Sequence, residues 1–173
     1  MNSYKLETNK LNKLLLEAVK DCDCNKIKEL IAKGADINAK EFKEEYIKTP
    51  LHCAALQGEL EIAILLIEQG ADIDAQDIFY ATPLYSATSQ GNYEVVKSLI
   101  EHGANINAQR LDKKTALHCA VENEYRDIVK LLLEKGANEN IQDHKGMKPI
   151  DYARSGANKE MIKIFNSTVK NCK

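Results

Sequence analysis

The sequence predicts an all-α repeat solenoid, in which helix-turn-helix units stack side by side and polar links join them. Three observations support this prediction. A similar segment recurs every 33 residues, starting at Thr49, Thr82, Thr115 and Lys148. A glycine follows each second apolar stretch at the same point of the period, as expected of a residue in left-handed conformation after a helix. No unit can bury its apolar face alone, whereas stacked units share a continuous core.

The first unit matches the period imperfectly. Leu15 and Gly34 fall into the frame of the later units, although three residues are inserted between Asn38 and Thr49. Its expected helices carry polar residues, which suit the outer end of an array: Lys20, Asp21 and Lys26. We therefore predict that residues 9–40 form an N-terminal cap, because terminal repeats need a polar outer face for solubility.

Residues 41–76, 77–109 and 110–142 are predicted to be three internal units. In the first two, Thr49 or Thr82 precedes a proline, which suits a helix N-cap followed by a first helical position that needs no N–H. Small alanines in the first helix allow close approach of its neighbours, and a second apolar helix follows. A polar link such as ADIDAQ or ANINAQ then leads to the next unit.

Residues 143–173 are predicted to form a C-terminal cap with a charged second helix that carries Lys159, Glu160 and Lys163. Two residues depart from the pattern. Glu124 falls where other units have glycine, so the turn either holds a strained non-glycine residue, at a cost of about 1–2 kcal/mol, or changes shape. Ser98 replaces a leucine, which should weaken local packing.

The period, the TPLH tetrapeptide, the paired alanines and the GAD-x-N link together resemble the ankyrin repeat over about residues 9–169. The resemblance implies about five units including two caps, each with two antiparallel helices, and β-hairpin-like loops that project between them. It also implies that residues 1–173 form a single, elongated and slightly curved domain.

Composition excludes several classes of protein. The net charge of −2 gives no basic footprint for nucleic acid, and no apolar run approaches the roughly 20 residues of a membrane span. The N-terminus lacks the apolar core of a signal peptide, and the five cysteines are interpreted as reduced thiols. We expect a cytoplasmic monomer, or a protein secreted into a host cell without a cleaved signal peptide, that binds neither nucleic acid nor membrane.

The sequence predicts no catalytic residue, metal site or cofactor. His52 and His118 belong to the TPLH pattern, in which the family uses the histidine to hydrogen-bond between neighbouring units. Cys53 and Cys119 are two units apart, roughly 20 Å at about 10 Å per helix layer, which is too far for a disulfide. The carboxylates show no paired spacing that suggests acid–base chemistry.

The resemblance implies that partners contact the hairpin tips and the inner face of the first helices. The candidate tip residues are Phe42, Tyr46, Ile78, Phe79, Tyr80, Leu111, Lys113 and Lys114. The candidate inner-face residues are Leu56, Gln57, Ser89, Gln90, Glu122 and Asn123. Ile78, Phe79 and Tyr80 are adjacent in a tip where the family commonly has polar residues and a glycine. Exposed aromatic clusters mark interaction surfaces, but these side chains could instead pack beneath the enlarged first loop at Phe42.

Charge changes along the tips. The first loop is acidic with interleaved lysines, and the later tips are basic through Arg110, Lys113, Lys114 and Lys145. This gradient is either a solvated rim or a means of orienting a dipolar partner, which mainly raises the association rate.

Asn38 is a candidate modification site. With Asp36 two residues before it and Leu30 eight before it, Asn38 resembles the site that asparagine hydroxylases of animal cells modify in ankyrin repeats. The alternative is an ordinary turn asparagine.

We therefore expect a non-catalytic protein–protein interaction module that regulates or inhibits one target. The alternatives are a bacterial effector that acts on host proteins, and an adaptor, which would need a second module or face. An enzyme would need a constellation of residues that the sequence does not contain.

Overall fold

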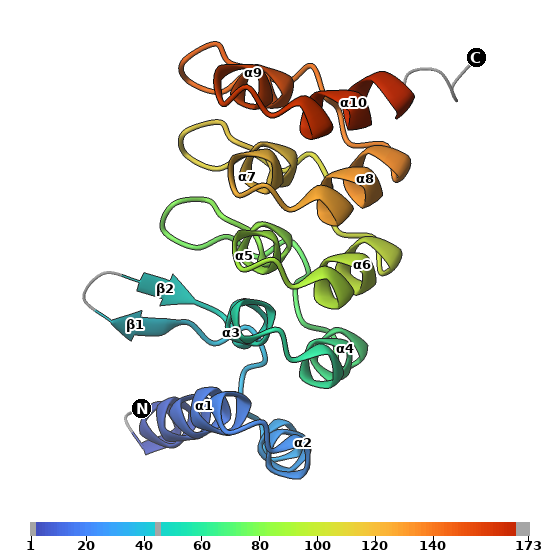
Figure 1. Cartoon of the computed structure of the whole chain (residues 1–173). Coiled ribbons are helices and arrows are strands. Elements are labelled where there is room, and N and C mark those ends of the chain that lie inside the picture. The colour runs from blue at the N-terminus through green and yellow to red at the C-terminus, as the bar shows by residue number, and fades with distance from the viewer. Residues whose placement is uncertain (1–2, 44–45, 169–173) are drawn as a thin grey trace.

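The computed structural model describes the backbone of residues 3–43 and 46–168, and the side chains of residues 7–40 and 48–167. The described residues form two columns of helices, with one inner and one outer helix in each of five stacked units (Figure 1). The inner helices are α1 (Ser3–Lys20), α3 (Pro50–Gln57), α5 (Pro83–Ser89), α7 (Ala116–Glu122) and α9 (Pro149–Ser155). The outer helices are α2 (Cys24–Ala32), α4 (Leu60–Glu68), α6 (Tyr93–Glu101), α8 (Arg126–Glu134) and α10 (Lys159–Thr168). The predicted solenoid of about five units is confirmed.

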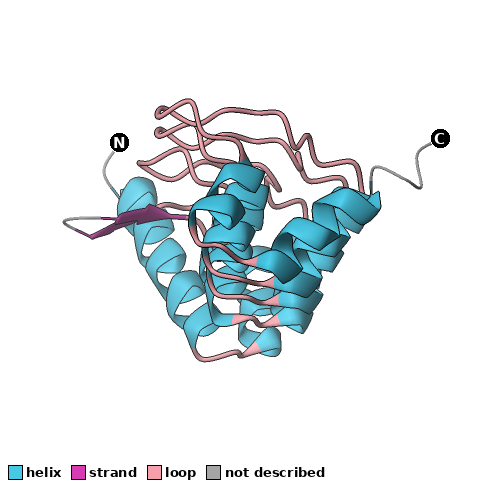
Figure 2. Cartoon of the chain, turned by 45° about the horizontal axis from the view of Figure 1, so that its top comes forward, coloured by secondary structure: helices cyan, strands magenta, loops and turns pink. Residues whose placement is uncertain are grey.

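The loop between the first and second units is a true β-hairpin. Strands β1 (Glu41–Lys43) and β2 (Tyr46–Lys48) pair antiparallel, with Phe42 opposite Ile47. This loop contains the three extra residues, which give it the length for a short ladder. The later loops run side by side in successive units without strands in the described part of the chain (Figure 2).

Local residue choice explains where the helices begin and end. The hydroxyl oxygens of Thr49 and Thr82 accept hydrogen bonds from the N–H groups of His52 and Tyr85, at 3.5 and 3.3 Å. The outer helices end before glycines whose φ lies between 88° and 92°: Gly34, Gly70, Gly103 and Gly136. These starts and stops are the ones that the sequence predicts.

Helix α1 differs from the other inner helices in length. It has 18 residues, whereas the others have seven or eight, and it begins at Ser3, ahead of the expected boundary of the first unit at residue 9. At the other end of the stack, Met161 and Phe165 of α10 are buried against the preceding unit. Charged residues of both terminal units are exposed, as the prediction of terminal caps requires: Lys20, Asp21, Lys159, Glu160 and Lys163.

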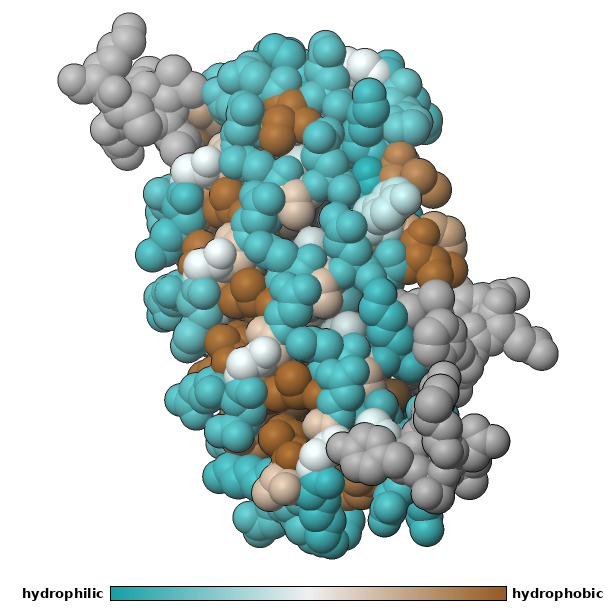
Figure 3. Space-filling view, turned by 180° about the vertical axis from the view of Figure 1, so that it is seen from behind, coloured by the Kyte–Doolittle hydropathy of each residue, from teal (hydrophilic) through white to brown (hydrophobic). Residues whose placement is uncertain are grey.

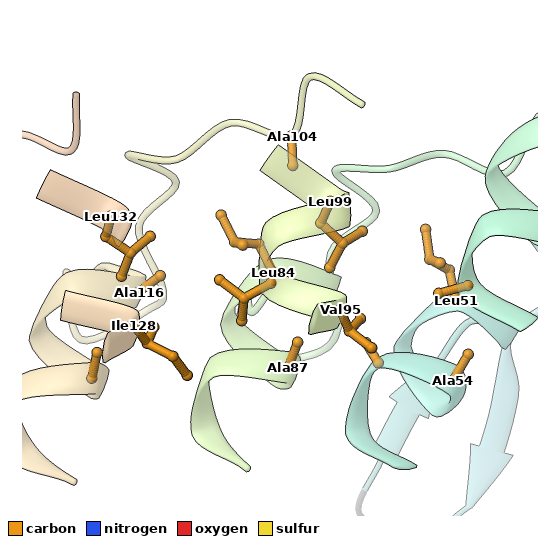
Figure 4. Packing of buried hydrophobic residues seen from close by; sticks show 14 of the residues in the cluster. Leu51, Ala54, Leu84, Ala87, Val95, Leu99, Ala104, Ala116, Ile128 and Leu132 are labelled. Atoms are coloured by element: carbon orange, nitrogen blue, oxygen red, sulfur yellow. The ribbon is translucent and has the colours of Figure 1, made fainter. Parts of the chain in front are cut away.

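The core runs through the stack without interruption. Leu51, Leu84 and Leu117 occupy equivalent places on successive inner helices, and each is at most 1% exposed. Leu84, Val95 and Leu99 lie in the space between successive units (Figure 4). Seen from behind, the surface is mostly hydrophilic and its hydrophobic residues form separate patches (Figure 3). The inner and outer helices therefore bury one shared apolar layer.

The turn between the two helices of each unit explains the departure at Glu124. Glu124 has a φ of 60°, as expected for a strained non-glycine residue. A side chain at Gly58 would come within 2.9 Å of Asn92 in the next unit. Asn158 instead donates a hydrogen bond to the Glu124 carboxylate at 2.9 Å. A side chain at Gly58 would crowd Asn92, whereas the side chain of Glu124 is hydrogen-bonded by Asn158, the equivalent residue of the following unit.

Candidate functional site

The last three hairpin tips are closed by aspartate side chains. We call residues 77–81, 110–114 and 143–147 the second, third and fourth tips. In the second tip, Asp77 Oδ1 accepts hydrogen bonds from the N–H groups of Phe79 and Ala81, both at 2.8 Å. In the fourth tip, Asp143 Oδ1 does the same for the N–H groups of residues 145 and 147. The second and fourth turns are thus each held by the carboxylate of their first residue, and their outermost side chains are free to vary.

One position in each tip adopts a left-handed backbone. Its φ is 59° at Tyr80, 61° at Lys113 and 72° at Gly146. Glycine adopts this conformation freely, whereas other L-residues lose about 1–2 kcal/mol. The second and third tips therefore carry backbone strain that the fourth tip avoids.

Four apolar side chains of the second and third tips are exposed. We call Ile78, Phe79, Tyr80 and Leu111 the tip ridge; their exposed fractions are 41%, 41%, 51% and 54%. Hydrophobic residues are visible at the edge of the molecule where the tips project (Figure 3). The candidate side chains of Phe42 and Tyr46 lie outside the described residues. The four exposed side chains form the largest apolar feature of the described tips.

Backbone hydrogen bonds join successive tips into one edge. The Leu111 N–H donates to the Phe79 carbonyl at 2.8 Å, and the His144 N–H donates to the Asp112 carbonyl at 3.0 Å. Neighbouring tips are therefore fixed relative to one another, and the tip ridge is a continuous surface.

Arg110 supports the tip ridge from the third tip. Its guanidinium carbon lies 5.9 Å from the ring centre of Phe79 and 4.9 Å from that of Tyr85. Nη1 of Arg110 also donates a hydrogen bond to the Tyr85 hydroxyl oxygen at 3.1 Å. Burial raises the pKa of Tyr85, so this hydroxyl stays neutral. Cation–π contacts thus hold Phe79 in place while leaving it exposed.

Two histidines attach the second and fourth tips to the preceding units. His52 Nε2 lies 2.9 Å from the Ala81 carbonyl oxygen, and His118 Nε2 lies 3.1 Å from that of Met147. Nδ1 of His52 accepts a hydrogen bond from the Thr49 N–H at 3.3 Å, so the neutral ring donates through Nε2. Burial lowers the pKa of both histidines. The predicted hydrogen bonds between units are confirmed.

The polar candidates on the inner face mostly bond to their own scaffold. Gln57 donates to the Lys20 carbonyl at 3.2 Å, and Asn123 donates to the Cys119 carbonyl at 2.9 Å. Ser89 donates to the Ser86 carbonyl, and Gln90 donates to the Ser89 hydroxyl.

A charged pair closes the C-terminal part of this face. The Lys114 ammonium lies 2.6 Å from a Glu122 carboxylate oxygen and 5.0 Å from the Tyr152 ring centre. Leu56 is half-buried. The structure therefore brings Lys114 together with Glu122, and it leaves the inner face with fewer free groups than the tips.

Sequence reasoning missed the roles of Arg110 and Asp77. The repeat register contains a signal for both, because Asp77, Arg110 and Asp143 lie 33 residues apart and only Arg110 is not an aspartate. The same register places Tyr80 and Lys113 at the position of Gly146. Tyr93, 37% exposed on α6, is a further exposed aromatic residue that was not among the candidates.

The candidate modification site lies in a ladder of side chains between units. Asn38 Oδ1 accepts a hydrogen bond from the Asp72 N–H at 2.9 Å, and the Asn38 N–H donates to Asp36 Oδ1. The Asn107 side chain makes the equivalent contact with the N–H of residue 138. Asn38 is half-buried and has a structural role in linking the first two units.

The described residues offer little for metal or disulfide chemistry. Within them, no group of three or more His, Cys, Asp or Glu side chains is placed to hold a metal ion. Cys53 and Cys119 are buried, and the four cysteines whose side chains are described, which include Cys22 and Cys24, form no disulfide. None of the described helices combines the length and apolar character needed to cross a membrane.

The fold and its tips define a helical repeat protein that presents a row of loops from a rigid stack. Residues 15–110, 77–143 and 108–171 match the family model described as ankyrin repeats (3 copies). The chain therefore belongs to the ankyrin repeat family, whose repeats are generally non-catalytic modules of protein–protein interaction. The chain is similar to the putative ankyrin repeat protein FPV244 of Fowlpox virus (strain NVSL), with 36% identity over 80 residues. That match covers 43% of this chain and 12% of the viral protein.

Proposed function

We propose that this protein binds a single protein partner through its hairpin tips and acts as a regulator or inhibitor by occluding that partner. The observation that carries the proposal is the tip ridge. Large apolar side chains that remain 41–54% exposed on adjacent, hydrogen-bonded turns are typical of an interaction surface. Aromatic residues are favoured anchors of such surfaces because they bury much area with few rotatable bonds.

The backbone strain at Tyr80 supports the same proposal. A glycine at this position would avoid the strain, as Gly146 does in the fourth tip. Strained residues cluster at functional sites, where the surrounding structure fixes a side chain for use. The hydrogen bonds of the Asp77 carboxylate supply that fixation. The tyrosine is therefore better explained by binding than by stability.

We expect the inner face to contribute less to binding than the tip ridge does. Its polar side chains already have hydrogen-bond partners in the scaffold, so new contacts there would replace existing ones. We expect Leu56 and the exposed polar rim of the inner helices to add specificity, and the tip ridge to add most of the affinity.

The cysteines support a reducing compartment for this function. The four cysteines whose side chains are described carry no disulfide, and two of them are buried. We propose a cytoplasmic location, with delivery into a host cell as the alternative, and a monomer that acts without catalysis, metal, membrane or nucleic acid.

The test is the double substitution Phe79→Ala with Tyr80→Ala. A partner is captured from lysate on the wild-type chain and identified, and its affinity is measured with purified components by titration calorimetry. We expect binding to weaken by about 2–4 kcal/mol, as for interface hot spots. The melting temperature should change little, because the tips lie outside the helical stack.

Tyr93→Ala is the matched control, because Tyr93 is an exposed aromatic residue on the outer helix α6. It should leave the affinity unchanged. A double variant with a lower melting temperature and wild-type affinity would show that the two residues serve the loop and not a partner.

A further inference from the structure

The charges at the tips are not equally available to a partner. The three tip carboxylates are used within the tips: Asp77 and Asp143 cap their turns, and Asp112 accepts a hydrogen bond from the Lys114 N–H at 3.2 Å. Lys113 and Lys145, in contrast, are exposed. No carboxylate among the side chains that the structure describes lies within ion-pair distance of either ammonium group. The tips thus present unpaired positive charge, although the chain as a whole is slightly acidic.

We propose that the tip ridge, together with Lys113 and Lys145, binds an acidic, apolar peptide segment of a partner protein. The proposal rests on the proposed function and specifies the chemistry of the partner. Apolar side chains of the segment would pack on the tip ridge, and its carboxylates would meet the two lysines. Paired charges at the rim of an apolar patch contribute mainly to specificity and to the rate of association.

The order of the tips gives the segment a direction. The apolar residues lie in the second and third tips, and the lysines lie in the third and fourth, so the surface changes from apolar to cationic along the stack. Successive helix layers are about 8–10 Å apart, and an extended peptide advances about 3.3 Å per residue. An extended segment would therefore place its acidic residues about three to six positions from its apolar ones.

The same surface fits a nucleic acid less well. Binding to a phosphate backbone depends on several cationic contacts, and this surface offers two unpaired lysines beside four apolar side chains. Aromatic residues can stack on bases, however, so the experiment includes oligonucleotides as a separate arm.

The test is a selection of random 12-residue peptides displayed on phage against the full chain. We expect enriched peptides in which Asp and Glu outnumber Lys and Arg and accompany large apolar residues. One enriched peptide is then synthesised with a fluorophore, and its Kd is measured by anisotropy. We expect Lys113→Glu with Lys145→Glu to raise this Kd at least tenfold. The Kd of the wild-type chain should also rise between 50 and 500 mM NaCl, because salt screens exposed charges.

Lys28→Glu with Lys97→Glu is the matched control, because it makes the same change in net charge on the outer helices α2 and α6. It should leave the Kd within twofold of wild type. If charge reversal at the tips lowers the melting temperature, Lys113→Gln with Lys145→Gln replaces it, and a threefold or larger rise in Kd is then expected.

Two kinds of failure are distinguishable. Enriched peptides that are neutral or basic, but lose binding to the Phe79→Ala and Tyr80→Ala variant, would overturn the acidic partner and leave the proposed surface standing. Peptides that bind this variant as well as wild type, or no enrichment at all, would overturn both. Tighter binding of a 20-nucleotide single-stranded DNA or RNA that depends on the same lysines would overturn the peptide in favour of a nucleic acid.

Discussion

The second and fourth tips have the same backbone design and different surfaces. Each begins with an aspartate that caps the turn, and each ends at a carbonyl group that a histidine of the preceding unit contacts. Each also has one residue in left-handed conformation. That residue is Gly146 in the fourth tip, whereas it is Tyr80, next to Phe79, in the second.

The difference shows that the surface of a tip can be changed without changing its scaffold. The aspartate and the histidine fix the turn in both cases, so the residues between them are free to serve another purpose. The fourth tip has Gly146 at this position, the residue with the least backbone strain in the left-handed conformation. The second tip carries a large exposed aromatic residue whose left-handed conformation destabilises the folded protein. Such a cost is expected when a side chain is retained for binding.

The third tip is intermediate between them. Lys113 adopts the left-handed conformation, and a hydrogen bond between Arg110 and Tyr85 joins this tip to the preceding unit where the other two tips use histidine. The three tips thus share a backbone and differ in anchor and surface, and each difference can be tested.

The largest expected effect comes from deleting the fourth tip with its unit. A chain that ends at Gly136 lacks α9 and α10, including the buried Met161 and Phe165, and leaves His118 without its contact at Met147. Burying each such side chain is worth about 1.5–3 kcal/mol, so we expect a loss of roughly 5 kcal/mol or aggregation. Urea denaturation and size-exclusion chromatography measure both. A truncated chain that stays monomeric and equally stable would show that the last unit is not a cap.

Much of this comparison could be predicted from the sequence because the repeat fixes the register. The glycines after the outer helices, the N-cap threonines and the bonds of His52 and His118 follow from positions that recur every 33 residues. On the same basis the turn at Glu124 is expected either to be strained or to change shape, and the φ of 60° at Glu124 shows the first of these. Local chemistry and periodicity are sufficient for features that lie within one unit.

Contacts between different units were harder to predict. Arg110 lies between Phe79 and Tyr85 because the third tip is placed over the second, and nothing in the sequence of either tip alone specifies that distance. The hydrogen bond of Asn158 to Glu124 likewise depends on the exact stacking of two units. The exposure of the tip ridge depends on the same placement, so the sequence left binding and self-packing open.

The next largest expected effect is a pH dependence of stability, which distinguishes the two tips attached by histidine from the third tip. His52 and His118 are neutral in the folded protein because burial lowers the pKa of each, whereas in the unfolded chain they take up protons near pH 6.5. The unfolded state therefore binds more protons as the pH falls. Stability should be fully present above about pH 6.5 and decrease below it, by at most about 1.4 kcal/mol per pH unit for each histidine.

Urea denaturation between pH 5 and 7.5 measures this slope. Although burial opposes it, hydrogen bonds from Tyr152 and from backbone N–H groups hold the pKa of Asp143 below its ordinary value, so this carboxylate titrates below the chosen range. His52→Gln should lower stability at pH 7.5 and flatten the slope. Amide exchange at pH 5.5 should increase in the second and fourth tips more than in the third. A uniform increase would contradict the assignment of the anchors.

The smallest expected effect on stability comes from substituting the residues in left-handed conformation, and it tests the difference between the second and fourth tips most directly. Tyr80→Gly removes the strain at φ 59° and gives up little packing, because Tyr80 is 51% exposed. We expect the free energy of unfolding to rise by about 0.5–1 kcal/mol, since the strain relieved exceeds the entropy that glycine adds to the unfolded chain. In Gly146→Ala, the new Cβ would meet no atom within 4 Å, so a loss of about 1 kcal/mol would report backbone strain alone.

The two variants should therefore change stability in opposite directions, as measured by urea denaturation at pH 7.5. If Tyr80 is a binding anchor, the more stable Tyr80→Gly protein should also bind its partner more weakly. Gly146→Ala should be less stable and bind normally. This crossed result would separate stability from binding at equivalent positions of two tips. A Tyr80→Gly protein that loses stability would mean that the tyrosine packs against the scaffold, and the difference between the tips would then lie in their folding and not in their function.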